Sequence, residues 1–429
     1  MSRTLITVAA TLFLLQAAAL RAQERPERPY RGLFGGDDES LQGLSVSGSL
    51  GAGYDTDLAS DASDVDGGNT DFGNRPGGVL GQFSGSLAYF VSRGDANLSA
   101  NAGTTGRYYP SATDKLLRRH NAGIQGSTPI GAGFTASGSA SYSPFRVWDL
   151  YTTPVPARSE ASDAFDFGSS SAHYLAYSGS LGGGWQLSRR LSFGASYRYG
   201  GRAASADIPK HASHSAGANM RYDLARGLAL NLGYGYREAR YEDRDKYVTH
   251  GINAGIDFSR ALSFSRRTTL SFSTGTSAAG SPSSGEGLQY YAVGDAALSH
   301  EIGRTWRATV SYSRSLQISE YWPEPIFSDG VSGGLTGLVN RRVQVHSRAG
   351  ASSGQVSTED SGGFDTYFAD AGVTFSLTRH VGFGTSYRYY HHQFSEAFRL
   401  LPGMPPVLDR HSLHAHVTVW APLFQHRRP

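Results

Sequence analysis

Apolar and polar residues alternate with a period of two along most of this chain. In Leu44–Tyr54, apolar side chains occupy most of the even positions, and Ser or Gly fills most of the positions between them. The same alternation returns in residues 79–91, 228–236 and 413–423. Because successive side chains of a strand point to opposite faces, this pattern predicts many β-strands, each with one apolar and one polar face.

Short and long connections take turns between these strands. Residues 92–96, 187–190 and 377–380 form short ones, whereas 55–77 and 145–171 are long. Outer-membrane barrels alternate brief periplasmic turns with larger outer loops in this way, with roughly ten residues per membrane-crossing strand. We therefore predict an all-β fold, a transmembrane antiparallel up-and-down β-barrel of about 18 strands.

Two segments that are distant in the chain have nearly the same sequence. Leu187–Gly200 reads LSRRLSFGASYRYG, and Leu377–His392 reads LTRHVGFGTSYRYYHH. We expect the basic turn to lie at one membrane boundary, the first apolar pair in lipid, and the tyrosines at the far interface, where amphipathic rings gather. A soluble sandwich or propeller would also alternate, but the Ser- and Gly-rich face is too small and polar to fill a protein core.

The chain ends suggest export to the cell envelope. Arg3 and the apolar run Leu5–Leu20 predict a secretory signal peptide over residues 1–22. We expect a flexible periplasmic segment over 23–40, the barrel over 41–424 and a C-terminal extension over 425–429. The sequence contains no Cys, which excludes disulfides.

Composition narrows the partners. The net charge is +3, and the basic residues are spread singly rather than clustered, so we expect no nucleic-acid partner. The mean hydropathy of −0.35 suits a soluble protein, but it also suits a barrel in which half of each strand faces water.

The polar face carries charges of both signs. Strand parity predicts that the following residues line the lumen: Arg107, Arg198, Arg221, Arg237, Arg307, Arg348, Arg388, Asp223, Asp257, Asp295 and Asp370. The arginine excess would favour anions, as charged rings do in other pores. Alternatively, Arg–Asp pairs across neighbouring strands only brace the wall.

Three groups of residues have the side chains of a metal or catalytic site, but none has the required spacing or partners. The acidic loop from Asp55 to Asp71 fails the spacing of an EF-hand calcium site, so we expect a solvated loop. Five histidines near the C-terminus raise the prospect of a transition-metal site, but no orienting partner can be identified: His391, His392, His411, His414 and His416. Serine is too common for any Ser–His pairing to indicate catalysis, and we expect no enzyme activity, no metal and no cofactor.

Aromatic residues in two long loops are candidates for contact with solutes. Trp148 and Tyr151 fall in one predicted loop, and Tyr321, Trp322 and Phe327 fall in another. They could stack on sugars, constrict the lumen, or simply pack over the barrel rim.

The G-x-S-Y-R-Y strand ends, the L-[ST]-R-[RH] turns and the segment GLTGLVNRRVQVHSRAG resemble the outer-membrane β-barrel porin families. These families include barrels that accompany exopolysaccharide export. The resemblance covers residues 41–424 and implies a porin-like fold and role. Phe424 resembles the terminal aromatic residue that the barrel-insertion machinery reads, but QHRRP follows it.

The leading hypothesis is a Gram-negative outer-membrane channel that passes or exports hydrophilic solutes, saccharides or anions among them. The alternative is a structural or adhesive barrel with partner-binding loops and a closed lumen. The expected partners are outer-membrane lipid and lipopolysaccharide, the barrel-insertion machinery and polysaccharide-export components.

Overall fold

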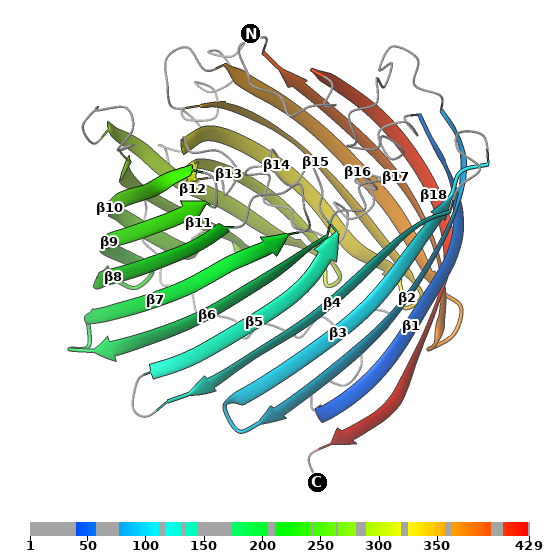
Figure 1. Cartoon of the computed structure of the whole chain (residues 1–429), viewed down its shortest axis with the longest axis horizontal. Coiled ribbons are helices and arrows are strands. Elements are labelled where there is room, and N and C mark those ends of the chain that lie inside the picture. Colours follow the sequence, from blue (N-terminus) through cyan, green and yellow to red (C-terminus); the bar gives the residue numbers. More distant parts are fainter. Residues whose placement is uncertain are drawn as a thin grey trace.

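The chain forms a barrel of tilted strands (Figure 1). The computed structural model describes residues 40–56, 77–110, 116–130, 134–144, 173–204, 211–241, 244–262, 265–279, 289–318, 325–356, 362–395 and 406–427. The predicted signal peptide and nearly all of the predicted N-terminal segment lie outside these ranges.

Eighteen strands make up the wall over the ranges that the structure describes. The first nine are β1 (Ser40–Asp55), β2 (Gly78–Arg93), β3 (Ala96–Tyr108), β4 (Leu116–Pro129), β5 (Phe134–Pro144), β6 (His173–Gln186), β7 (Leu191–Ala204), β8 (His211–Ala225) and β9 (Leu228–Tyr241). The others are β10 (Arg244–Leu262), β11 (Ser265–Ala279), β12 (Gln289–Ile302), β13 (Trp306–Ile318), β14 (Pro325–Asn340), β15 (Val343–Val356), β16 (Gly363–Ser376), β17 (Val381–Phe394) and β18 (Val407–Arg427).

The sheet closes on itself. Each strand pairs antiparallel with its neighbours in chain order, and β1 also pairs with β18 from Ser40↔Arg427 to Asp55↔Ser412. Closure leaves no strand edge with unpaired backbone groups, which is what a hydrocarbon environment demands of a sheet. The predicted 18-stranded transmembrane up-and-down barrel is thereby confirmed. No helix among the described residues is long and apolar enough to span a membrane.

Several strand boundaries differ from the expected ones. The polar sequence after Tyr236 suggests that β9 ends early, yet β9 reaches Tyr241 and β10 begins at Arg244. The final strand also continues past Phe424 to Arg427, because Gln425 and His426 still pair with β1. Charged and polar residues at these positions obscured the strand ends, since a strand that extends beyond the membrane no longer needs an apolar face.

Tight turns join the strands at one end of the barrel. Gly94, Gly227 and Gly303 lie between β2 and β3, β8 and β9, and β12 and β13, with φ of +62°, +78° and +66°. Only glycine adopts this backbone conformation without strain. We call this the short-turn end, and the other the opposite end.

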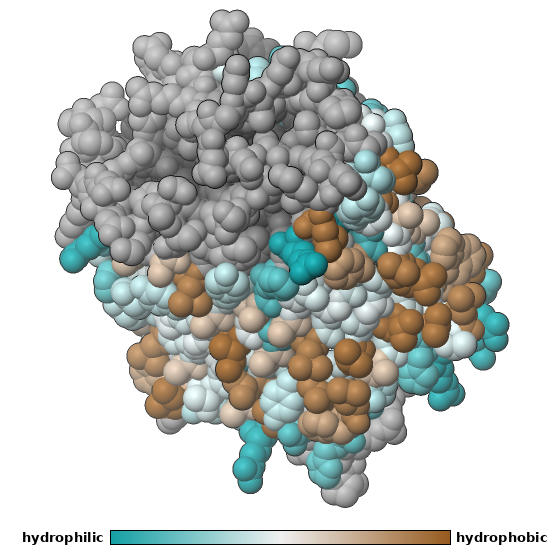
Figure 2. Space-filling view, turned by 45° about the vertical axis from the view of Figure 1, so that its right-hand side comes forward, coloured by the Kyte–Doolittle hydropathy of each residue, from teal (hydrophilic) through white to brown (hydrophobic). Residues whose placement is uncertain are grey.

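Large apolar side chains cover the outer surface. Leu50, Val79, Leu232 and Leu413 are each at least half exposed, and they share one face of the barrel with many similar residues. Figure 2 shows apolar side chains over much of the outside of the strands, with hydrophilic ones at the lower end. An exposed apolar surface of this extent is solvated by lipid tails rather than by water.

Aromatic rings border this apolar surface at both ends. At the short-turn end, Trp185 stacks on Phe193 with ring centroids 5.8 Å apart, and Phe258 stacks on Phe272 at 5.3 Å. Tyrosines take the corresponding place at the opposite end. Two aromatic belts on either side of an apolar band are typical of the two interfaces of a membrane.

Candidate functional site: the barrel lumen

The cross-strand register places the predicted lumen residues on a common face. In each strand they alternate with the exposed apolar residues, so they point to the inside of the closed barrel: Arg107, Arg198, Arg221, Arg237, Arg307, Arg348, Arg388, Asp223, Asp257, Asp295 and Asp370. The remaining inward positions are mostly Ser, Thr, Asn and Gly. The inner face is therefore mainly polar over the described part of the wall, with apolar side chains such as Leu80 and Phe364 at the opposite end.

Paired serine hydroxyls run along this face. Among the described residues, hydrogen bonds of 2.6–2.8 Å join serines on neighbouring strands in five places: Ser47–Ser86, Ser49–Ser84, Ser137–Ser180, Ser139–Ser178 and Ser311–Ser332. A hydroxyl carries two acceptor lone pairs and one rotatable donor, so each pair keeps capacity for water or a solute. Such a wall is wettable without presenting net charge.

Some of the inward charges brace one another. Arg221 contacts Asp223 at 3.0 Å and Asp257 at 2.9 Å, and Arg307 lies 3.7 Å from Glu301. The side chains of Arg221 and Asp257 keep 41% and 31% of their surface exposed, so each pair contributes little to stability. At Arg221 the geometry favours the bracing role over the selectivity role.

The lumen has two contrasting regions. The open wall consists of the inward side chains of β5–β8, where Ser137, Ser139 and Arg198 are exposed. The buried patch lies at the opposite end of β16–β18 and β1–β3, and its inward side chains are almost inaccessible: Asp55, Leu80, Arg107, Thr366, His392, Arg410, Ser412 and His414.

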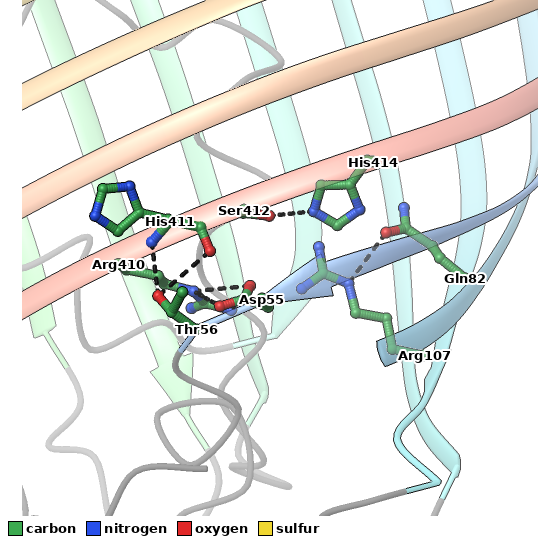
Figure 3. Close-up of polar contacts among 8 residues, drawn as sticks. All are labelled: Asp55, Thr56, Gln82, Arg107, Arg410, His411, Ser412 and His414. Atoms are coloured by element: carbon green, nitrogen blue, oxygen red, sulfur yellow. Dashed lines mark hydrogen bonds and ion pairs between the residues drawn. The ribbon is translucent and has the colours of Figure 1, made fainter. Parts of the chain in front are cut away.

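An ion pair at the centre of the buried patch joins the first and last strands. Nε of Arg410 donates to both carboxylate oxygens of Asp55 at 3.0 Å, and Nη2 donates to Oδ2 at 2.7 Å (Figure 3). Asp55 is 0% exposed and Arg410 is 1% exposed. Next to them the amide of Thr56 donates to the carbonyl of His411 at 3.0 Å, so the barrel seam extends beyond the last register pair.

Further polar groups gather around this ion pair. Nε of Arg107 donates to Oε1 of Gln82 at 3.2 Å, and the hydroxyl of Ser412 hydrogen-bonds the ring of His414 (Figure 3). A Cβ at Gly53 would lie 2.6 Å from Nδ1 of His414, closer than real Cβ atoms approach. Glycine at this position therefore makes room for the imidazole to lie against the wall.

Sequence reasoning missed the ion pair. Asp55 was assigned to the acidic loop, and Arg410 was not singled out, because both lie beyond the apolar part of their strands. The signal was present nonetheless. Alternation continues past Tyr54 and Leu413, so Asp55 and Arg410 fall on the inward face of β1 and β18. The other aspartates of that loop, 57–71, lie outside the described residues.

The C-terminal histidines do not converge. His392, His414 and His416 lie on the inward face, whereas His391 and His411 lie on the outward face. His392 is fully buried, hydrogen-bonds Thr366 at 2.6 Å and stacks on Phe364. Within the described ranges, no group of three or more His, Cys, Asp or Glu could hold a metal ion.

One of the predicted loop aromatics lies elsewhere. Phe327 was expected in a long loop, but it lies in β14, where it pairs with Leu316. Its ring centroid lies 5.5 Å from that of Tyr291, and the guanidinium carbon of Arg314 lies over the ring at 4.7 Å from the centroid. The prediction was wrong because β14 begins at Pro325, earlier than its polar sequence suggests. Trp148, Tyr151, Tyr321 and Trp322 lie outside the described residues.

Comparison with known proteins concerns the architecture alone. No family model matches the sequence, and no curated protein matches it. Among solved structures, the chain is similar to Pseudomonas aeruginosa OccK2 (OpdF) in complex with glucuronate, at 9% identity, with 89% of this chain and 98% of that chain covered and a TM-score of 0.47.

Two other solved barrels are similar at the same level. The FrpB iron transporter of Neisseria meningitidis (F3-3 variant) is 10% identical, with 91% of this chain and 83% of that chain covered and a TM-score of 0.44. A loop-deletion mutant of OmpT, an outer membrane protein of Vibrio cholerae, is 11% identical, with 89% and 100% covered and a TM-score of 0.36. At such low similarity, the solutes of these proteins say nothing about the solute of this chain.

Proposed function

We propose that the protein is an outer-membrane, porin-like channel that passes or exports hydrophilic solutes through its lumen. One observation carries the proposal: a closed 18-stranded barrel whose outer face is apolar and whose inner face is lined by hydroxyls, arginines and aspartates. Barrels of 16–18 strands are wide enough to keep an aqueous channel after the side chains are placed.

Saccharides and small anions are the solute classes that fit this lumen. The serine pairs of the open wall offer many neutral donors and acceptors, which suit a hydroxyl-rich solute. The inward arginines outnumber the inward aspartates in the set predicted from strand parity, and Arg198 is exposed on the open wall. An excess of positive charge raises the local concentration of anions.

The placement in the cell follows from the same architecture. The short-turn end faces the periplasm in this proposal, and the long connections face outward, as in other bacterial outer-membrane barrels. Export would use the predicted signal peptide over residues 1–22, and the barrel-insertion machinery would read the last strand around Phe424. Polysaccharide-export components are proposed partners of an export-linked channel. Neither a cofactor nor a catalytic step is needed.

The alternative is a structural or adhesive barrel with a closed lumen, and the buried patch is the observation that favours it. Conductance across a planar lipid bilayer separates the two. We expect the purified full-length protein to give stable ohmic steps that decrease when an impermeant polymer blocks the pore. Correctly inserted protein that stays silent over a wide voltage range would overturn the channel and leave the structural role.

A further inference from the structure

The outward face carries the same cluster of three side chains on three separate hairpins. In each, two tyrosines at i and i+2 on one strand lie beside a histidine on the next strand. We call these clusters the rim triads: Tyr197, Tyr199 and His214 on β7–β8; Tyr234, Tyr236 and His250 on β9–β10; and Tyr387, Tyr389 and His411 on β17–β18.

The geometry of the triads is nearly constant. The hydroxyl of the first tyrosine lies 2.7, 2.7 and 2.8 Å from Nδ1 of the histidine. The ring of the second tyrosine lies 4.7, 5.4 and 4.7 Å from the imidazole centroid. Each imidazole is thus held by a hydrogen bond from the first tyrosine and by ring contacts with both tyrosines, which fixes its orientation.

The register places the triads at one depth of the membrane. His214 is opposite Tyr199, His250 opposite Tyr236 and His411 opposite Tyr389, all on the face that carries the exposed apolar residues. Towards the short-turn end, each tyrosine strand continues with outward Leu, Phe or Val side chains. The triads therefore lie just above the hydrocarbon band, at the level of the lipid headgroups at the opposite end of the barrel.

A hydrophobic belt alone does not account for the histidines. When the tyrosine hydroxyl donates to Nδ1, the ring proton lies on Nε2, which points away from the tyrosine and can donate to another group. Arginines at the same end of the outward face are matched by carboxylates: Arg240 pairs with Glu238 at 2.8 Å, and Arg314 contacts Asp329 at 3.7 Å. The donor that the triads themselves present is the histidine Nε2–H, and an acceptor fixed at headgroup depth that matches it is a phosphate.

We propose that the rim triads bind the phosphate groups of outer-leaflet lipopolysaccharide, with the histidine Nε2–H as donor and the tyrosine rings packed against the neighbouring lipid surface. This proposal rests on the membrane placement of the proposed function, but not on an open lumen. The tyrosine hydroxyl acts as a positioning group, because it sets the tautomer and the direction of the imidazole.

The test compares full-length variants in detergent. Purified lipopolysaccharide, and the same glycolipid after removal of its phosphates, are titrated into the wild type and into the triple variant His214→Phe, His250→Phe and His411→Phe. Phenylalanine keeps an aromatic ring but removes the donor. We expect the triple variant to lose about tenfold in affinity for lipopolysaccharide, which corresponds to about 1.4 kcal/mol. We expect the wild type and the triple variant to bind the dephosphorylated form equally weakly.

His300→Phe is the matched control. His300 also lies outward and hydrogen-bonds a neighbour, Thr268, at 2.7 Å, but it lies at the short-turn end. Its loss should leave lipopolysaccharide binding unchanged. A second triple variant, Tyr197→Phe, Tyr234→Phe and Tyr387→Phe, keeps the apolar rings and loses only the hydroxyls, so we expect a smaller loss in affinity than the histidine variant shows.

Folding and function are followed in the same samples by circular dichroism and bilayer conductance. Equal affinity of wild type and histidine variant, both correctly folded, would overturn the proposal, as would tight binding of the dephosphorylated glycolipid. If the wild type conducts normally and the histidine variant binds lipid as the wild type does, the lipid site is refuted and the channel function stands. If the wild type forms silent channels and the histidine variant shows the expected loss of lipid binding, the channel function is refuted and the lipid site stands.

Discussion

The open wall and the buried patch belong to the same lumen and follow the same alternation, yet they are built from different chemistry. On the open wall, small hydroxyl side chains pair with one another and remain accessible. In the buried patch, the charged side chains of Asp55 and Arg410 are taken out of water and joined by several hydrogen bonds. A charge on the open wall can act on a solute because it is solvated, whereas a charge in the patch is committed to its partner.

This difference predicts where substitutions will affect stability and where they will affect transport. Ion pairs in contact with water contribute little, but removal of one partner from a buried pair leaves an uncompensated charge. The patch should therefore control the free energy of unfolding, and the open wall should control conductance.

Arg410→Met should have the largest effect. It leaves the carboxylate of Asp55 buried without its guanidinium, so we expect the free energy of unfolding to fall by about 3–5 kcal/mol. Urea unfolding in lipid vesicles measures the change. Arg221→Met on β8 is the matched control and should stay within about 1 kcal/mol of the wild type. If the double variant Arg410→Met with Asp55→Leu recovers no stability, buried charge is not the cause.

Gly53→Ala should come next. The new Cβ would lie 2.6 Å from Nδ1 of His414 inside the buried patch, so the imidazole must move. We expect a loss of about 1–3 kcal/mol, typical of overpacking. Gly184 lies on the inward face of β6, and no atom lies within 4 Å of the Cβ position there. Gly184→Ala should therefore unfold at the wild-type urea concentration, and a loss equal to that of Gly53→Ala would refute the packing argument.

Ser139→Trp should separate transport from stability. The indole would project from the open wall into the lumen, so we expect a lower single-channel conductance with a free energy of unfolding within about 0.5 kcal/mol of the wild type. Ala140→Trp, at the adjacent outward position, is the control and should leave conductance unaltered. An unchanged conductance in Ser139→Trp would show that ions do not pass along β5.

Arg198→Glu should have the smallest structural effect. Arg198 is exposed on the open wall, so reversal of its charge should shift the reversal potential in a salt gradient towards cation preference. The shift should shrink at high ionic strength because salt screens the charge. If the shift persists undiminished in concentrated salt, the variant has altered the shape of the pore rather than its field.

Much of the fold could be predicted because lipid imposes a strict pattern on each strand. The alternation predicts both the secondary structure and the outward face of Leu44–Tyr54 and of residues 228–236. The same alternation of positions assigns Arg221 and Asp257 to the inside. The pattern weakens where strands leave the membrane. Arg240, Phe327 and Arg410 lie in strand segments free of that constraint, and the ends of β9, β14 and β18 were accordingly misjudged or missed.

Pairing between residues distant in sequence could not be predicted at all. Asp55 and Arg410 are 355 positions apart, and only the closed register brings them together. One part of each rim triad, the pair of tyrosines, could be recognised from the sequence because the pair repeats along the chain. Their histidines lie on neighbouring strands and become recognisable only when the register is known.

The link between Asp55 and Arg410 also has a consequence for biogenesis. A nascent or truncated chain that lacks β18 would present two unsatisfied sheet edges and a stranded carboxylate, so it cannot reach a stable state in the bilayer. The barrel therefore depends on β18 both for its closure and for the guanidinium that pairs with the carboxylate of Asp55.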